Sequence, residues 1–388
     1  MKRFIIEQSD EEFYTSTSGI SLIGLALNRF TNLAPSIAKA VPLSHGISHA
    51  DVIRSFCALL AQGKSDFAAI EQRREDDFFR EAPGLKQVPS EATLRQRMDD
   101  HAAEFLRVVS WATVAFLMKA EVPLTSLSTG HIAVDIDGFA MDNSGTKKEC
   151  VSRTYRNFDG YLAMPVYLAN EGWLIECPLL PGSRHPRKAF NPLLQRALAK
   201  IRQISKDKLL LRADSAHDAV ANRVELSLHD DVDYIIKWNP RKQDPEVWKT
   251  QAFSKGTVET PRPGKRVAIF SVLERHSATD ENGKEKELAF RRVMRVTERA
   301  IDKKGQQLLF PDIELEGWWT SLSVQDEEVI ALYRGHGLCE QYHSGIKTGM
   351  DLERFPSGKF ATNQLVMACT ALVYNILRFI GQGSRKTL

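Results

Sequence analysis

The alternation of short apolar runs with helix-like segments over residues 131–238 is the feature that most narrows the possible folds. In the run HIAVDIDGFAMD, the side chains of Ile132, Val134 and Ile136 fall on one face, as they do in a half-buried strand. Two strand-like runs, a helix, a strand, a second helix and a last strand follow in order, at 160–169, 173–180, 192–204, 208–212, 216–228 and 233–238. Three strands followed by helix, strand, helix and strand predict an α/β sheet with helices on its faces.

The flanking segments have a different texture. Apolar residues recur at helical spacing between residues 20 and 120, and Ser90 before Glu91 has the chemistry of a helix N-cap. Short alternating pieces rich in Lys, Arg, Thr and Val fill residues 240–320, and helical texture returns from Glu327 to about residue 380. We therefore expect four regions along the chain: an N-terminal helical domain at 1–125, an α/β core in two parts at 126–239 and 323–388, and a β-rich insertion between those parts at 240–322.

Composition excludes several classes of protein. Five Cys residues are widely spaced and include no CxxC pair, which argues against a disulfide scaffold or a zinc module. The N-terminal MKRFIIEQSDEEF lacks the apolar core of a signal peptide, and the apolar stretches 108–118 and 365–380 are shorter than a membrane span needs. We therefore expect a cytoplasmic protein. Residues 1–125 carry 14 Lys and Arg against 16 Asp and Glu, so any nucleic-acid surface should lie mainly in the later part.

Three acidic residues stand out by their positions. Asp137 lies on the first predicted strand, on the face opposite its apolar neighbours. Asp214 lies at the exit of the fourth strand, and Glu340 lies on the helix after the insertion. One Asp at a strand end is more often a turn residue. Three carboxylates that converge beside a sheet could instead hold a pair of divalent cations such as Mg²⁺, which prefer hard oxygen ligands and promote phosphodiester chemistry.

The segment around Glu340 adds a second pattern. Tyr333, His336, Glu340 and Lys347 would fall within an arc of about 60° on one helix. A salt-bridged surface helix is one interpretation of this stripe. The functional alternative places Glu340 on metal, while Tyr333, His336 and Lys347 contact phosphates.

This stripe resembles the Tyr–Arg–Glu–Lys signature of bacterial insertion-sequence transposases of the DDE class. That signature reads Tyr, two residues, Arg, three residues, Glu, six residues, Lys. Tyr333, Glu340 and Lys347 match it in identity and spacing, whereas His336 stands where the family has Arg and Arg334 lies off the stripe. The segments 142–149, 211–215 and 352–360 are also similar to one branch of these transposases.

The resemblance implies a ribonuclease-H-like mixed sheet with flanking helices, with Asp137, Asp214 and Glu340 as the catalytic and metal-binding triad. It implies two Mg²⁺ or Mn²⁺ ions per site. Asp135 is the rival for the first position because it shares a strand face with Asp137. The family's usual Asp-x-Thr pattern is not met, since Phe139 replaces Thr.

The implied function is a DNA transposase that binds the terminal inverted repeats of its element and excises and integrates it by phosphodiester hydrolysis and strand transfer. Its partners would be double-stranded DNA and a second copy of the chain in a bacterial, nucleoid-associated setting. A stand-alone structure-specific nuclease and a non-catalytic DNA-binding derivative are the alternatives. In this interpretation region 1–125 would be the DNA-binding domain, and the two core parts would form the catalytic core. The DNA backbone would be held by basic positions of the insertion and by Lys147, Lys148, Arg153 and Arg156. Further DNA-binding residues would be Tyr333, His336, Lys347 and Arg334.

Overall fold

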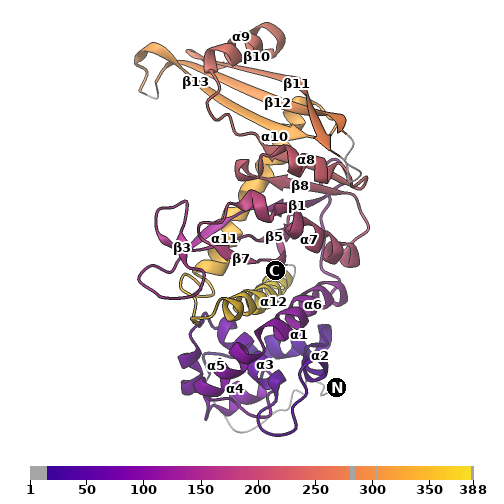
Figure 1. The fold of residues 1–388 in the computed structure, drawn as a ribbon, viewed down its shortest axis with the longest axis vertical. Coiled ribbons are helices and arrows are strands. Elements are labelled where there is room, and N and C mark those ends of the chain that lie inside the picture. Colours follow the sequence, from indigo (N-terminus) through magenta and orange to yellow (C-terminus); the bar gives the residue numbers. More distant parts are fainter. Residues whose placement is uncertain (1–14, 280–284, 303, 386–388) are drawn as a thin grey trace.

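The computed structural model describes residues 15–279, 285–302 and 304–385, and its three parts follow one another along the long axis (Figure 1). Helices from both ends of the chain gather at one end, a mixed sheet occupies the middle, and long strands form an arm at the other end. The N-terminal stretch expected to lack a signal peptide lies almost entirely outside the described residues.

The N-terminal part is helical, as the apolar spacing predicted. Ser90 caps the helix that begins at Glu91, because its Oγ accepts a hydrogen bond from the backbone N–H of Thr93 at 3.2 Å. The helices of this part are α1 (Ile20–Phe30), α2 (Leu33–Ala40), α3 (His49–Ala61), η1 (Phe67–Arg73), α4 (Asp77–Glu81), α5 (Glu91–Asp100) and α6 (Ala102–Lys119).

The last helix of the chain, α12 (Phe360–Arg385), joins this helical part. It packs on α6, α3 and α1, and the rings of Phe30, Phe116 and Phe379 meet edge to face with centroids 5.8–6.0 Å apart. The sequence placed the C-terminal helices with the catalytic core. In the structure α12 packs on the N-terminal helices and also contacts β6 of the central sheet. Its 360–384 portion is long and apolar enough to cross a membrane, and 61% of its most apolar window is buried inside the protein. The sequence analysis counted only the apolar stretch 365–380, which is shorter than a membrane span. The helix itself is longer, because it continues beyond this stretch at both ends.

The central sheet has the topology that positions the site. Its strands are β1 (Ile132–Ile136), β5 (Val166–Leu168), β6 (Trp173–Glu176), β8 (Leu209–Ala213) and β9 (Val232–Lys237), in the order β6-β5-β1-β8-β9. β1, β8 and β9 run parallel, β5 is antiparallel to β1, and the connecting helices are α7 (Phe190–Ile204) and α8 (Val220–Leu226). Every residue of β1 and β8 is buried, which explains their nearly continuous apolar sequences.

Each of the two strand-like runs predicted after β1 is divided between two sheets. The breaks fall at Pro165 and Pro178, which cannot donate a backbone hydrogen bond to a neighbouring strand. The remaining pieces form a small antiparallel sheet of β2 (Phe139–Asp142), β3 (Ser152–Arg153), β4 (Asp159–Ala163) and β7 (Leu179–Pro181).

The region expected to hold the insertion is an extension of the central sheet. It contains α9 (Pro245–Lys255), β10 (Thr257–Arg262), β11 (Lys265–Thr279), β12 (Glu285–Ile301) and β13 (Gln307–Thr320). β13 pairs antiparallel with β9, so that among the described residues one sheet runs in the order β10-β11-β12-β13-β9-β8-β1-β5-β6. The arm is therefore joined to the core by the pairing of β13 with β9. This pairing fixes the direction of the arm more firmly than a flexible linker would.

An arginine enclosed by tryptophans lies where the arm meets the core. The guanidinium of Arg292 on β12 is 4.3 Å from the ring centroid of Trp238 and 4.7 Å from those of Trp248 and Trp319. Cation–π contacts of this kind are strongest where water is excluded, and Arg292 is only 3% exposed. The contacts therefore stabilise the junction of the arm with the end of β9.

After β13 the chain returns to the core through α10 (Asp326–Arg334), the 3₁₀ turns η4 (Gly335–Leu338) and α11 (Cys339–Lys347). Two short 3₁₀ turns, η2 (Pro186–Ala189) and η3 (Ser215–His217), complete the elements around the site. The whole is a mixed α/β fold with a large mixed sheet and flanking helices.

Candidate active site

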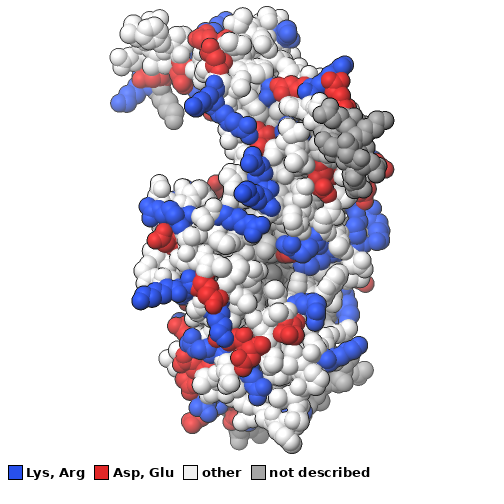
Figure 2. All heavy atoms as spheres, in the orientation of Figure 1, with Lys and Arg blue, Asp and Glu red and all other residues white. Residues whose placement is uncertain are grey.

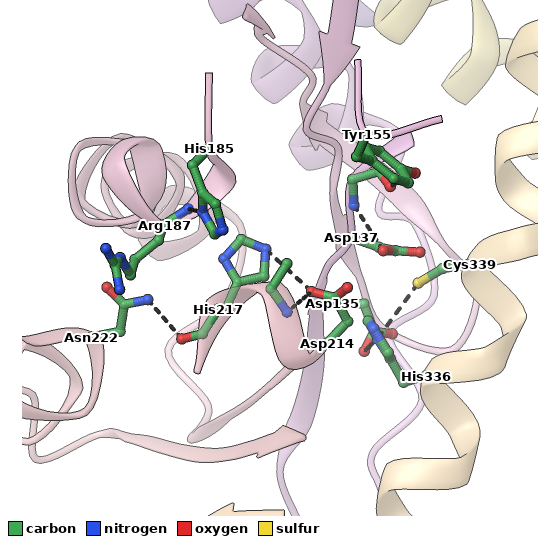
Figure 3. A network of polar contacts seen from close by, with 12 residues as sticks. Asp135, Asp137, Tyr155, His185, Arg187, Asp214, His217, Asn222, His336 and Cys339 are labelled. Carbon is green, nitrogen blue, oxygen red and sulfur yellow. Dashed lines mark hydrogen bonds and ion pairs between the residues drawn. The ribbon is translucent and has the colours of Figure 1, made fainter. Parts of the chain in front are cut away.

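The register of two parallel strands brings Asp137 and Asp214 to the same edge of the sheet. In the β1–β8 pair, Ile136 lies opposite Ala213, and each aspartate is the next residue along its strand. Asp137 Oδ1 accepts a 2.7 Å hydrogen bond from the backbone N–H of Gly138, and Asp214 caps η3 by accepting from the N–H of Ala216. Figure 3 shows both side chains around this edge.

Glu340, the third predicted carboxylate, reaches the same groove from helix α11. It lies in the first turn of α11, where a carboxylate is favoured by the helix dipole, and its side chain is exposed. Asp137, Asp214 and Glu340 line one groove of about 1040 Å³. These three carboxylates, which are distant in sequence, thus line the same groove. That they bind cations together stays a prediction.

The electrostatics of this edge favour a bound cation. Burial raises the pKa of Asp137 to about 6, with Asp214 adding to the effect and His336 opposing it. Burial also raises the pKa of Asp214, again opposed by His336. Both groups therefore hold their negative charge less readily than usual without a cation. A divalent ion would remove that cost, so the carboxylate set fits Mg²⁺ or Mn²⁺.

Two buried histidines lie beside the two aspartates. His217 Nε2 is 3.7 Å from Asp214 Oδ1, and His343 Nε2 is 3.8 Å from Asp137 Oδ2. Burial is the largest factor that lowers the pKa of each histidine to about 3, so both are neutral near pH 7. From the sequence, His217 is interpreted as a structural residue in the first turn of a helix, with a place near the metal as the alternative, and nothing singles out His343. The sequence signal that could have identified His343 is its position three residues after Glu340, one turn along the same helix.

The rival first aspartate, Asp135, lies below the groove instead of in it. Its two oxygens accept hydrogen bonds from Nε and Nη2 of Arg212, both at 2.7 Å. Its Oδ1 also contacts His336 Nδ1 at 3.1 Å, and Figure 3 shows these two side chains side by side. Although burial opposes it, Arg212 and His336 hold the pKa of Asp135 below its usual value. Asp135 is therefore a paired internal carboxylate.

The expected stripe along one continuous helix was wrong in its geometry. η4 interrupts the helix between Arg334 and Cys339, because Gly335 and Gly337 favour helix poorly and Arg212 packs against Gly335. The angular spacing of an uninterrupted helix therefore does not apply across this segment.

His336 is the clearest correction among the expected phosphate contacts. The side chain is only 7% exposed and its Nδ1 is engaged with Asp135. Burial lowers its pKa, but the bond and charge of Asp135, with Asp137, outweigh this and raise it overall. His336 is thus more basic than a free imidazole, and it contacts Asp135 inside the protein.

Tyr333 and Lys347 keep positions near the groove. The Tyr333 ring lies 6.1 Å from Trp318 and 5.5 Å from His336, and burial followed by Asp214 and Asp137 raises its pKa, so the hydroxyl stays protonated. Lys347 lines the groove with its ammonium 5.1 Å from the ring centroid of Phe139. Phe139, which replaces the expected Thr, also packs on His343 at 4.4 Å.

The other predicted DNA-binding residues divide into two kinds. Arg334 and Lys147 are exposed. Lys148 is engaged inside the protein, where its ammonium donates to Asn143 Oδ1 and to the backbone carbonyl of Phe355. It anchors the loop before α12, so its expected contact with DNA is not supported.

The basic residues of the arm are largely neutralised by the strands beside them. Arg291 pairs with Asp326 and Arg295 with Glu316, and similar ion pairs hold the other members of this group: Arg266, Arg292 and Arg299. The groove itself is lined by exposed basic residues: Arg153, Arg156, Arg184 and His185. Arg153 and Arg156 were expected to hold the DNA backbone, whereas nothing in the sequence singled out Arg184. Figure 2 shows Lys and Arg side chains gathered along the hollowed side of the molecule.

Comparisons with known proteins identify the family of the chain. Among solved structures the chain is similar to the piggyBac transposase in a cryo-EM structure of its synaptic complex with hairpin DNA, with 10% identity and a TM-score of 0.45 over 96% of this chain and 75% of that one. No curated protein matches. Residues 12–386 match the profile of the family described as transposase DDE domain group 1, for which a divalent metal cofactor is implied. A match over nearly the entire length establishes that the chain belongs to the DDE transposase family, domain group 1.

Proposed function

We propose that this protein is a DNA transposase that binds the terminal inverted repeats of its own element, excises the element and integrates it into target DNA. The observation that carries the proposal is the meeting of Asp137, Asp214 and Glu340 in one groove. These residues come from β1, β8 and α11, so only the assembled fold provides the set.

The three carboxylates would hold Mg²⁺ or Mn²⁺, two ions per site. When bound, such ions activate an attacking water or 3′-hydroxyl and stabilise the oxygen that leaves the phosphodiester. The raised pKa values of Asp137 and Asp214 support this assignment, because both groups lack a compensating cation in the protein alone.

The remaining groove residues suit the DNA backbone. Lys347, Arg156 and Arg184 offer positive charge around the carboxylates, and phosphate contacts of this kind position DNA without reading its sequence. Tyr333 keeps its hydroxyl proton, which suits a hydrogen-bond donor to phosphate and not a nucleophile. No covalent protein–DNA intermediate is needed in this scheme.

The expected partners follow from the reaction. Two element ends must be paired before strand transfer, so we propose a homodimer in the DNA complex. The N-terminal helices would bind the inverted repeats, in the bacterial cytoplasm at the nucleoid.

The test uses the full-length protein and the DNA that flanks its gene. Both flanking ends are incubated with Mg²⁺ or Mn²⁺, and every cut and joined strand is mapped. Cleavage restricted to the ends, with joining to a second DNA, is the expected result. Cleavage without end preference or joining would indicate a stand-alone nuclease, and binding alone a non-catalytic derivative.

Two variants make this test specific. Asp214→Asn should leave end binding nearly intact and abolish nicking. Asp244→Asn is the matched control, because Asp244 caps α9 through the same contact to the N–H two residues on, at 3.0 Å, but lies outside the groove. Normal nicking by the Asp214 variant would remove it from the triad.

A further inference from the structure

A buried polar cluster lies directly below the groove and is absent from its lining. Arg212 donates to Asp135 through Nε and Nη2 and to the backbone carbonyl of Leu332 through Nη1, at 2.7, 2.7 and 2.9 Å. His336 Nδ1 contacts the same carboxylate. None of the three side chains is more than 8% exposed, so nothing in solvent competes for these bonds.

Two members of this cluster each lie two residues before a member of the triad along the chain. Asp135 lies two residues before Asp137 on β1, and Arg212 lies two residues before Asp214 on β8. The two strands pair with Asp135 opposite Arg212. The bidentate ion pair therefore joins the two strands one side-chain repeat below the point where their catalytic carboxylates emerge.

The same arginine fixes the third element. Its Nη1 donates to the carbonyl of Leu332 and so holds the end of α10. His336 lies in η4, on the segment that leads to Glu340, and its Nδ1 contacts Asp135. A Cβ at Gly335 would lie 2.4 Å from Arg212 Nη1, so the backbone of η4 approaches the guanidinium as closely as glycine permits.

We propose that Asp135, Arg212 and His336 form a positioning clamp that locks β1, β8 and the α10–η4 segment together, and thereby preorganises Asp137, Asp214 and Glu340 for divalent cations. The clamp rests on the proposed metal-binding role of those three residues. Its own members are positioning residues, because none of them lines the groove.

A direct metal-binding role for the cluster is the competing explanation. Ligand atoms of Asp135, His336 and Cys339 lie within 4.8 Å of one another. The carboxylate, however, already has both oxygens bonded to a guanidinium, and a cation there would have to displace that fixed positive charge. The geometry therefore favours the clamp.

The experiment measures Mn²⁺ binding to the full-length protein without DNA, by the loss of the free-ion signal in electron paramagnetic resonance. Arg212→Lys keeps the charge but cannot make the three fixed bonds. We expect it, like Asp135→Asn and Gly335→Ala, to weaken Mn²⁺ binding about 10- to 100-fold, the range found for residues that support metal ligands. Arg202→Lys is the control, because Arg202 bonds the carbonyls of Asp207 and Asp231 beside the opposite ends of β8 and β9.

Folding is separated from positioning by a double variant. Asp135→Leu with Arg212→Met removes both charges and keeps an apolar filling, which commonly preserves stability. We expect this protein to melt near the wild-type temperature but to bind Mn²⁺ as weakly as the single variants. Wild-type affinity in the double variant, or in folded Arg212→Lys, would overturn the clamp.

The Asp214→Asn variant reports on the proposed function separately. Loss of Mn²⁺ binding there, with normal binding in the clamp variants, would leave the triad in place and reject the clamp. Wild-type Mn²⁺ binding by Asp214→Asn would reject the triad, and with it the reason for a clamp.

Discussion

Replacing Asp137 with Asn should make the metal-free protein more stable near pH 7. The carboxylate is confined between β1 and α11, with Asp214 nearby, and its pKa rises from 3.8 to about 6 for these reasons, burial first. Asn keeps the shape and can still accept the hydrogen bond from the Gly138 N–H. The substitution therefore removes a poorly compensated charge and little else.

The size of the effect follows from that pKa. A rise of roughly two pKa units corresponds to about 3 kcal/mol of lost stability when the group is charged, at about 1.4 kcal/mol per unit. Solvent that reaches the side chain, which is 20% exposed, makes this an upper value. With about 2.1 cal/mol/K of unfolding entropy per residue over 388 residues, the melting temperature should rise by up to about 4 °C.

The pH dependence gives the sign. Below pH 3.8 Asp137 is protonated in the folded and unfolded states, so the carboxylate costs nothing there. Its cost grows as the pH rises, is complete above about pH 6, and is absent from the Asn variant. Melting curves in a chelating buffer between pH 4.5 and 8 should therefore separate progressively, with the variant higher.

Added metal should reverse the order. Mg²⁺ or Mn²⁺ binds the folded wild type and raises its melting temperature, whereas the Asn variant should respond weakly. Asp142→Asn is the control, because the exposed Asp142 accepts a bond from the N–H of Ser144 that lowers its pKa, and its removal should not stabilise the protein. An Asp137 variant that melts at or below the wild-type temperature in chelator at pH 7 would refute the reasoning.

Three further outcomes are expected. Trp319→Ala should cost about 3–5 kcal/mol and speed proteolysis of the arm, because the ring that covers two arginines at the junction is lost, and Trp319→Phe should cost less. Gly172→Ala should lower the melting temperature more than Gly130→Ala: both have positive φ, but only at Gly172 would the new Cβ meet the Tyr342 ring at 2.5 Å. Lys347→Ala should weaken DNA binding about equally for all sequences and reduce the slope of log affinity against log salt by about one, as filter binding can measure.

The predictable part of the site came from strands that end in aspartate. The apolar runs before Asp137 and Asp214 identify buried strands, and parallel neighbours end at one edge of a sheet. These two facts suffice to bring the carboxylates together, without knowledge of any contact. Whether they bind metal stays a prediction.

The predicted DNA contacts that the structure does not support belong to basic residues whose partners are distant in the sequence. Lys148 reads as a free surface cation until the carbonyl of Phe355 is placed beside it, and Arg295 reads as one until β13 supplies Glu316. The breaks at Pro165 and Pro178 were different, because there the local signal was present and the apolar runs masked it. Charge counts along the chain thus overstate a DNA-binding surface wherever strands of opposite charge pair.

The histidine at position 336 has a physical reason in this fold. Position 336 is buried beside Asp135, whose single negative charge already balances the fixed positive charge of Arg212. A second guanidinium there would leave one buried positive charge without a partner, which is costly. Histidine carries a proton only to the extent that Asp135 and Asp137 favour it, and it is small enough to share the carboxylate with Arg212. The histidine at position 336 and the buried ion pair are therefore two parts of one arrangement, in which this imidazole contacts Asp135 inside the protein.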